Sequence, residues 1–143
     1  MPLTAHDIRI RRRARARALQ ALYAWDLVPG GGLIKVGERL FGDLAVGPEE
    51  RGFANPILQK AAEALPVIDA DIASLTTNWR LERLSAIDRS VLRLAAAELH
   101  IGETPPITVI KEAIRLAERF GTDASARFVN GVLDALARKL GRI

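Results

Sequence analysis

The sequence predicts an all-α fold of about seven helices, joined by short connections and packed as bundles. Apolar residues recur at helical spacing along most of the 143 residues, and the alternating β-branched runs that would indicate strands are missing. Glycine and proline separate the apolar segments. The length suits a single domain with a substantial core, and the absence of cysteine excludes disulfides and thiolate metal sites.

The first predicted helix spans about residues 4–28 and joins a cationic half to an apolar half. Thr4 and Asp7 suit a capped start, and six arginines then fall within nine residues. At ~100° per residue, one face of this helix forms a buried stripe. Its members are Ala14, Ala18, Ala21, Leu22, Trp25 and Val28. The arginines lie almost all round the helix, so we expect the first turns to fray and to become ordered on an anionic partner.

The positive charge of the chain is concentrated in this first segment. The formal charge is +4, and residues 1–17 hold six of the 21 basic residues but only one of the 17 acidic ones. The remainder is close to neutral, which predicts local engagement of a polyanion. A solvated face explains six neighbouring like charges poorly, and a transit peptide would not continue into core residues.

Tyr23 falls on the side of the first helix away from the buried stripe, in line with Arg12 and Leu19. An exposed aromatic ring beside arginines suits single-stranded RNA, because guanidinium groups pair with phosphates and a base stacks on the ring. The spacing alone allows Tyr23 equally well at the edge of the core.

The middle of the chain gives weaker signals. Residues 33–44 have the apolar spacing of a short helix, whereas residues 46–55 give no clear prediction. Asn55 followed by Pro56 suits the start of the next helix. We expect Pro66 to kink or interrupt that helix.

The C-terminal part predicts three further helices. Residues 87–101 are apolar over most of the helix circumference, so this helix should be central and should end at Gly102. A second, amphipathic helix is expected to end at Gly121. The last helix should start near Asp123 or Ser125.

No catalytic or metal-binding constellation is visible, so we expect neither an enzyme nor a cofactor. His6 and His100 are far apart, and His100 suits the negative end of a helix. Glu49 and Glu50 are paired acids in a predicted loop, and no metal-ligand spacing occurs. No apolar run approaches the ~18 residues of a membrane span, and no signal peptide is visible. We expect a cytoplasmic protein without a membrane partner.

Three stretches of the chain resemble the NusB family of transcription antitermination factors. They read RRRARARALQALYAWDL at 11–27, NWRLERLSAIDRSVLRLAAAEL at 78–99 and IKEAIRLAERFGTDASARFVNGVLD at 110–134. The resemblance implies one all-helical domain over residues 1–143, built from two small bundles, with a basic arm at 1–17. It also implies binding of single-stranded boxA RNA in ribosomal RNA leaders together with NusE, a small-subunit ribosomal protein. The resulting complex acts on RNA polymerase, and some family members form homodimers that hide the RNA surface.

The resemblance assigns functional residues position by position. The expected RNA-binding residues are Arg11, Arg12, Arg13, Arg15, Arg17, Tyr23, Phe120, Arg127 and Phe128. By its spacing alone, Phe128 suits the core equally well. The expected protein-partner residues are Glu82, Arg89, Arg93 and Glu98. The chain departs from the family pattern at Lys111, Arg115 and Ala124, where asparagine, an acid and, in some members, aspartate are common.

Two other function classes stay open at this point. One is a helical protein-interaction module whose arginines bind an acidic protein. The other is an RNA-binding domain related to a ribosomal RNA cytosine methyltransferase, which carries a NusB-like domain at its amino-terminal end. Such an enzyme needs a cofactor-binding domain and a catalytic cysteine, and this sequence has neither.

Overall fold

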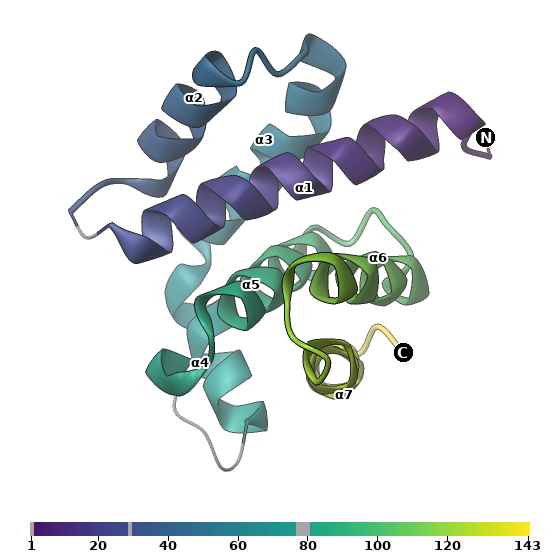
Figure 1. Ribbon diagram of the computed structural model, residues 1–143. Coiled ribbons are helices and arrows are strands. Elements are labelled where there is room, and N and C mark those ends of the chain that lie inside the picture. The colour runs from purple at the N-terminus through teal and green to yellow at the C-terminus, as the bar shows by residue number, and fades with distance from the viewer. Residues whose placement is uncertain (1, 29, 77–80) are drawn as a thin grey trace.

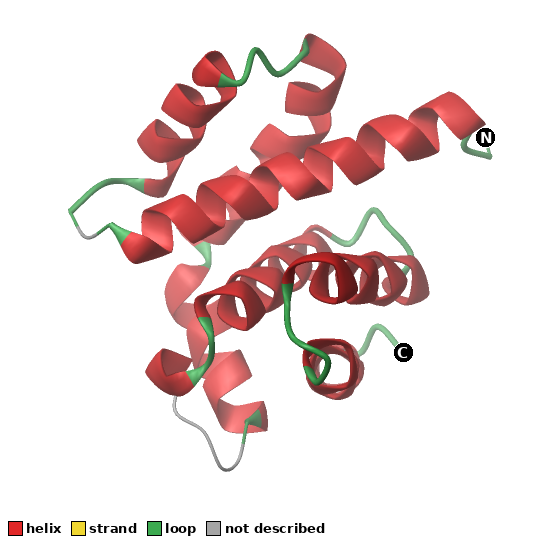
Figure 2. Cartoon of the chain, viewed as in Figure 1, coloured by secondary structure: helices red, strands yellow, loops and turns green. Residues whose placement is uncertain are grey.

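The computed structural model describes residues 2–28, 30–76 and 81–143 and confirms the all-α prediction (Figure 2). The described residues form seven α-helices and one short 3₁₀ turn, and none of them lies in a strand. The helices are α1 (Ala5–Leu27), α2 (Leu33–Asp43), α3 (Pro48–Glu63), α4 (Leu65–Leu75), α5 (Ala86–Ile101), α6 (Pro106–Phe120) and α7 (Ser125–Lys139). The 3₁₀ turn, η1, spans Leu81–Arg83. Residues 78–80, which begin the second matching stretch, lie outside the described residues.

Helix α5 lies at the centre of the molecule, as its sequence predicts. Every residue from 90 to 99 is buried, because α5 packs against α1 and α3 on one side and α4, α6 and α7 on the other (Figure 1). Helices α1, α2 and α3 also contact one another, and so do α6 and α7. The architecture is therefore two groups of helices that share α5.

The start of α1 carries the cap that the sequence predicts. Thr4 Oγ1 accepts a hydrogen bond from the backbone N–H of Asp7, whose carboxylate accepts one from the backbone N–H of Thr4, each at 3.0 Å. The second of these bonds lowers the pKa of Asp7 below its ordinary value. Leu19 is buried although it falls outside the predicted stripe, and Val28 within it is exposed. Leu19 is covered because α1 packs against three helices, whereas Val28 is the C-cap residue, beyond the last helical residue, Leu27.

The start of α3 also differs from the prediction. The helix begins at Pro48, not at Pro56, which lies inside it. Pro48 occupies the first turn, where a missing N–H costs nothing. Glu49 and Glu50 therefore lie in the first turn of a helix and not in a loop, where the positive end of the helix dipole favours them. Pro66 interrupts the helical path as expected, because α3 ends and α4 begins just before it.

The signals that bound the C-terminal helices are confirmed. Ser85 caps α5 by accepting a hydrogen bond from the backbone N–H of Asp88 at 3.1 Å. Gly102 ends that helix in the left-handed conformation, with φ of 79°. Gly121 follows α6, and Ser125 begins α7. None of the described helices is long and apolar enough to cross a membrane.

Candidate nucleic-acid interface

A groove lies between α1 and α6, which both pack against α5. Its wider part, of about 830 Å³, is lined by residues 8–15 of α1 and residues 108–115 of α6, and by neighbouring loop residues. Its narrower part, of about 400 Å³, is lined by residues 12–16 and 112–119. The two helices therefore run in the same direction along the groove (Figure 1). We call this feature the α1–α6 groove.

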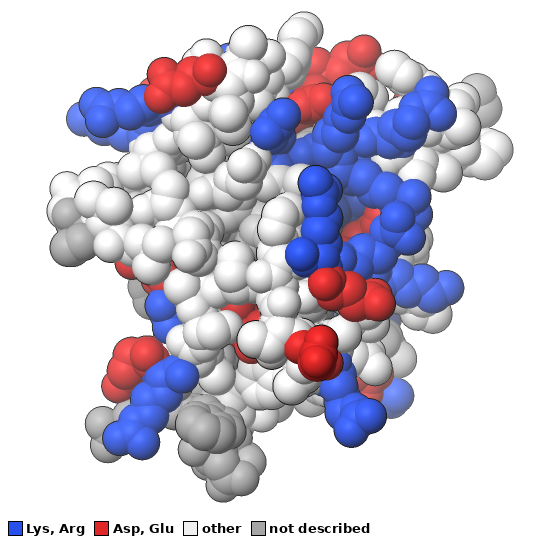
Figure 3. All heavy atoms as spheres, in the orientation of Figure 1, with Lys and Arg blue, Asp and Glu red and all other residues white. Residues whose placement is uncertain are grey.

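The α1–α6 groove is rich in cations. Its basic lining residues are Arg11, Arg12, Arg15, Lys111, Arg115 and Arg119. Its acidic lining residues are Glu103, Glu112 and Glu118. Figure 3 shows basic side chains gathered on one side of the molecule, over the first half of α1 and over α6. The excess of cations over acids makes this surface suited to an anionic partner.

Arg12 is anchored on α6 while remaining accessible. Its Nε donates hydrogen bonds to both carboxylate oxygens of Glu112, at 2.7 and 3.3 Å. The Arg12 side chain is 47% exposed, whereas the Glu112 side chain is 9% exposed. Both bonds use Nε, so within the described part of the chain the terminal nitrogens stay open to a ligand. Glu112 therefore orients Arg12 at the groove without enclosing it.

Arg15 has a different environment from Arg12. Its Nε and Nη2 donate hydrogen bonds to the two carboxylate oxygens of Glu98 on α5, at 2.8 and 2.6 Å. Both residues are buried, with exposed fractions of 5% and 3%. A bidentate, charge-assisted pair of this kind fixes the position of one helix on another. Arg15 thus holds α1 against α5, and its guanidinium does not face solvent.

Phe53 on α3 supports the arginine motif from the other side. The guanidinium carbons of Arg11 and Arg15 each lie 4.9 Å from the centre of the Phe53 ring. Stacking on an aromatic face orients both guanidinium groups, and it leaves the N–H edge of the more accessible Arg11 available. The sequence interpretation missed Phe53, because it lies in the segment that gave no clear prediction. It also missed Glu112, because its nearness to Arg12 depends on the tertiary fold.

The other two arginines of the motif lie closer to solvent. The Arg13 side chain is 74% exposed, and its Nη1 lies 3.7 Å from the carboxylate of Glu50 on α3. Arg17 is half-buried and donates a hydrogen bond from Nη1 to Gln20 at 3.1 Å. The ion pair of Arg13 is long and its guanidinium is exposed, and Arg17 bonds only a neutral amide, so a phosphate can compete for either guanidinium.

The aromatic candidates follow the narrow end of the α1–α6 groove. Tyr23, 36% exposed, lies on α1 about two turns beyond the groove. Phe120, 40% exposed, is the last residue of α6, and the guanidinium carbon of Arg119 lies 4.8 Å from its ring centre. Arg127 is exposed, and Phe128 is half-buried with its side chain packed against the core. Tyr23 and Phe120 can therefore offer a ring face to a base, and Phe128 mainly supports α7.

Comparison with known proteins places this geometry in a family. The family model for NusB matches residues 12–138. The chain belongs to the NusB family. It is 40% identical to the transcription antitermination protein NusB of Sorangium cellulosum over 134 residues, which cover 93% of this chain and 95% of that protein. The corresponding protein of Solibacter usitatus is 41% identical over 133 residues, covering 91% and 90% of the two chains.

Solved structures of the NusB family agree with this fold. NusB of T. maritima superposes with a TM-score of 0.84 at 35% identity, over 90% of this chain and 91% of that one. A structure of the antitermination factors NusB and NusE in complex with dsRNA contains a chain with a TM-score of 0.83 at 26% identity. The superposition covers 92% of this chain and 98% of that one. These relatives are antitermination factors and not enzymes.

Among the described residues, no cluster of three histidine or acidic side chains could hold a metal ion.

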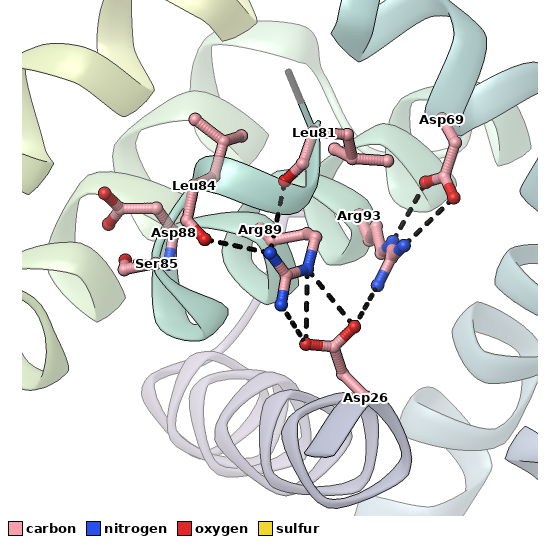
Figure 4. A network of polar contacts seen from close by, with 8 residues as sticks. All are labelled: Asp26, Asp69, Leu81, Leu84, Ser85, Asp88, Arg89 and Arg93. Atoms are coloured by element: carbon pink, nitrogen blue, oxygen red, sulfur yellow. Dashed lines mark hydrogen bonds and ion pairs between the residues drawn. The ribbon is translucent and has the colours of Figure 1, made fainter. Parts of the chain in front are cut away.

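Two of the four residues that the NusB resemblance assigns to a protein partner lie in an inward-facing ion-pair network (Figure 4). Arg93 on α5 donates to Asp69 on α4 at 2.9 Å and to Asp26 on α1 at 2.8 Å. Arg89 pairs with the same Asp26 and also donates to the backbone carbonyl oxygens of η1 and the residue after it. This network, which we call the Asp26 network, joins α1, α4, α5 and η1.

The electrostatics of the Asp26 network favour the charged forms. Burial acts to raise the pKa of Asp26, but the hydrogen bonds and charges of Arg89 and Arg93 outweigh it and leave that pKa below its ordinary value. Burial likewise acts to lower the pKa of Arg93, and its two aspartate partners reverse the direction. Of the four partner candidates, Glu82 is exposed on η1, whereas Glu98 is buried against Arg15. The accessible candidate surface is therefore η1.

Proposed function

We propose that this protein acts in transcription antitermination by binding single-stranded boxA-type RNA of ribosomal RNA leaders, together with NusE. Its membership of the NusB family supports the general role. The observation that supports RNA binding most directly is the α1–α6 groove, where accessible cations face a ligand-sized space. The related structure that contains NusB, NusE and dsRNA supports RNA and NusE as partners in general, and the proposal of a single strand rests on the resemblance to the family and on the lining of the groove.

We assign the roles of the site residues from how accessible their side chains are. Arg11, Arg12 and Arg13 pair with phosphates, because their side chains are accessible and already oriented by neighbours on α3 and α6. Tyr23 and Phe120 provide stacking faces for bases beyond the groove. Orientation in the free protein reduces the entropy that binding must remove.

For the protein partner, we propose that NusE contacts the surface around Glu82 on η1. Arg89 fixes this surface by donating hydrogen bonds to the backbone carbonyl oxygens of Leu81 and Leu84, at 3.1 and 2.8 Å. Assembly of the RNA and NusE complex on RNA polymerase, and a homodimer that hides the RNA surface, are further parts of this proposal. Sedimentation of the protein with and without RNA tests the homodimer, since RNA should then dissociate it.

The decisive experiment is a titration of a labelled boxA-like single strand, with and without NusE, at two salt concentrations. We expect binding that NusE strengthens and that salt weakens, because phosphate contacts release counterions. A scrambled strand of the same length is the control, and it should bind more weakly when NusE is present. Salt-resistant binding to NusE with no binding of RNA would instead support the protein-interaction module.

A further inference from the structure

We infer that α6 supplies a second row of phosphate-binding cations, so that the RNA strand is held in the α1–α6 groove from both sides. The row consists of Lys111, Arg115 and Arg119, which we call the α6 row. This inference rests on the proposed function and adds phosphate-binding residues on the α6 side of the same groove. The three residues are four apart, so they lie along one face of α6, and all three are exposed.

The α6 row faces the α1 arginines across a common space. Lys111 and Arg115 line the wide part of the groove together with Arg11 and Arg12, and Arg119 lines the narrow part. Arg115 Nε lies 3.6 Å from the Glu112 carboxylate, yet the Arg115 side chain is 59% exposed. Glu112 also accepts a hydrogen bond from Arg12 at 2.7 Å, so one carboxylate interacts with a cation of α1 and a cation of α6.

Helix stability explains only part of the α6 row. The ion pair of Arg115 with Glu112, three residues before it, favours the helix, but Lys111, Arg115 and Arg119 also repel one another at a spacing of four residues, and an anionic ligand would remove that repulsion. The apolar side of α6 that packs against the core is formed by other residues, including Val109, Ala113 and Leu116. The cations of α1 and α6 repel one another across the groove, and an anion lying between them would relieve that repulsion.

The remaining lining of the groove suits a single strand. The apolar side chains of Leu3, Ile8 and Ile114 line its wide part beside the cations. An unpaired nucleotide can place its base or ribose on such side chains while its phosphates contact the rim. A duplex keeps its bases stacked inside the helix, so it could use the cations but not the apolar lining.

The chain offers a matched control for this inference. Lys35 and Arg39 on α2 are also a lysine and an arginine four residues apart on an exposed helix face, and neither lines the groove. K111Q/R115Q and K35Q/R39Q therefore remove the same charge at the same spacing from an exposed helix face. A third variant, R12Q/R13Q, removes two cations of α1 and tests that side of the α1–α6 groove separately.

We expect K111Q/R115Q to bind the boxA-like single strand roughly five- to tenfold more weakly than wild type at low salt. The slope of log affinity against log salt should become shallower by about 1.4, or about 0.7 for each phosphate that the variant no longer neutralises. K35Q/R39Q should match the wild type in both measurements. Thermal unfolding by circular dichroism checks that all variants are folded.

Three results would overturn the inference. K111Q/R115Q could match K35Q/R39Q while R12Q/R13Q loses RNA, in which case the proposed function stands and the α6 row does not contribute. K111Q/R115Q could keep RNA affinity and lose NusE, in which case the row contacts protein. If the wild type binds no RNA with or without NusE, the proposed function itself fails.

Discussion

At the scale of single residues, the arginines of α1 divide according to the partner that each one has. Arg15 is enclosed by Glu98, whereas Arg12 is oriented by Glu112 and Arg13 stands in solvent. The sequence cannot show this division, because Glu98 and Glu112 lie 83 and 100 residues further along the chain. Only the packing of α5 and α6 beside α1 makes one arginine structural and its neighbours accessible.

Arg15→Ala is expected to lower the free energy of unfolding by about 3–5 kcal/mol, because it leaves Glu98 buried without its partner. The double variant R15M/E98M should recover most of this difference, since it replaces both charges with apolar groups. Urea denaturation measures both effects. We also expect the double variant to bind RNA as the wild type does. A stable double variant that no longer binds RNA would contradict the structural role of Arg15.

Tyr23→Ala is expected to weaken RNA binding by about 1–3 kcal/mol, because a base loses its stacking face. The Tm should stay near that of the wild type, since the ring is 36% exposed. Tyr23→Phe is the matched control and should retain affinity, because it keeps the ring. Fluorescence titration and thermal unfolding provide the two measurements. A large fall in Tm would show instead that the Tyr23 ring belongs to the core.

At the scale of elements, the Asp26 network links the end of α1 to α4, α5 and η1. Asp26 accepts from two arginines of α5, and one of them also holds Asp69 of α4. The other arginine donates to the carbonyl oxygens at η1. The surface proposed for the protein partner is therefore fixed by the same groups that hold the two sets of helices together.

This network predicts a specific pH dependence for the stability of the fold. The pKa of Asp26 is lowered in the folded state, so its stabilising effect is complete above the ordinary value of 3.8 and is lost as the pH falls through the lower folded value. Asp26→Asn should therefore be less stable than the wild type at neutral pH. The stability difference should stay constant down to about pH 4 and narrow below it. Urea titrations at several pH values test this, and a difference independent of pH in acid would contradict it.

At the scale of the whole molecule, the sequence predicted the helices that carry their own start and stop signals. Helix α5 is apolar almost all round and lies between Ser85 and Gly102, so both its position and its bounds follow from local chemistry. Helix α3 begins before its prediction because a glycine-containing segment with weak helix propensity is stabilised by packing on α1. Tertiary contacts outweighed propensity there.

The candidate site, like the helices, was predictable only where a feature depends on one segment of the chain. The position of the arginine motif follows from helix geometry, whereas helical spacing left Tyr23 open between an exposed ring and the edge of the core, and the structure places it at 36% exposure. The supporting roles of Phe53 and Glu112 do not, because they come from α3 and α6 and depend on how those helices pack. Helical spacing identifies the face of one helix, but the residues opposite that face are determined by the fold.

The central claim is that the accessible arginines of α1 bind RNA through its phosphates. The most direct test is the slope of log affinity against log salt for a boxA-like single strand, measured for the wild type and for R12A/R13A. With four to six phosphate contacts, the wild-type slope should be roughly −3 to −4, and the variant slope should be shallower by about 1.4. Equal slopes for the two proteins, with both folded by circular dichroism, would contradict the account.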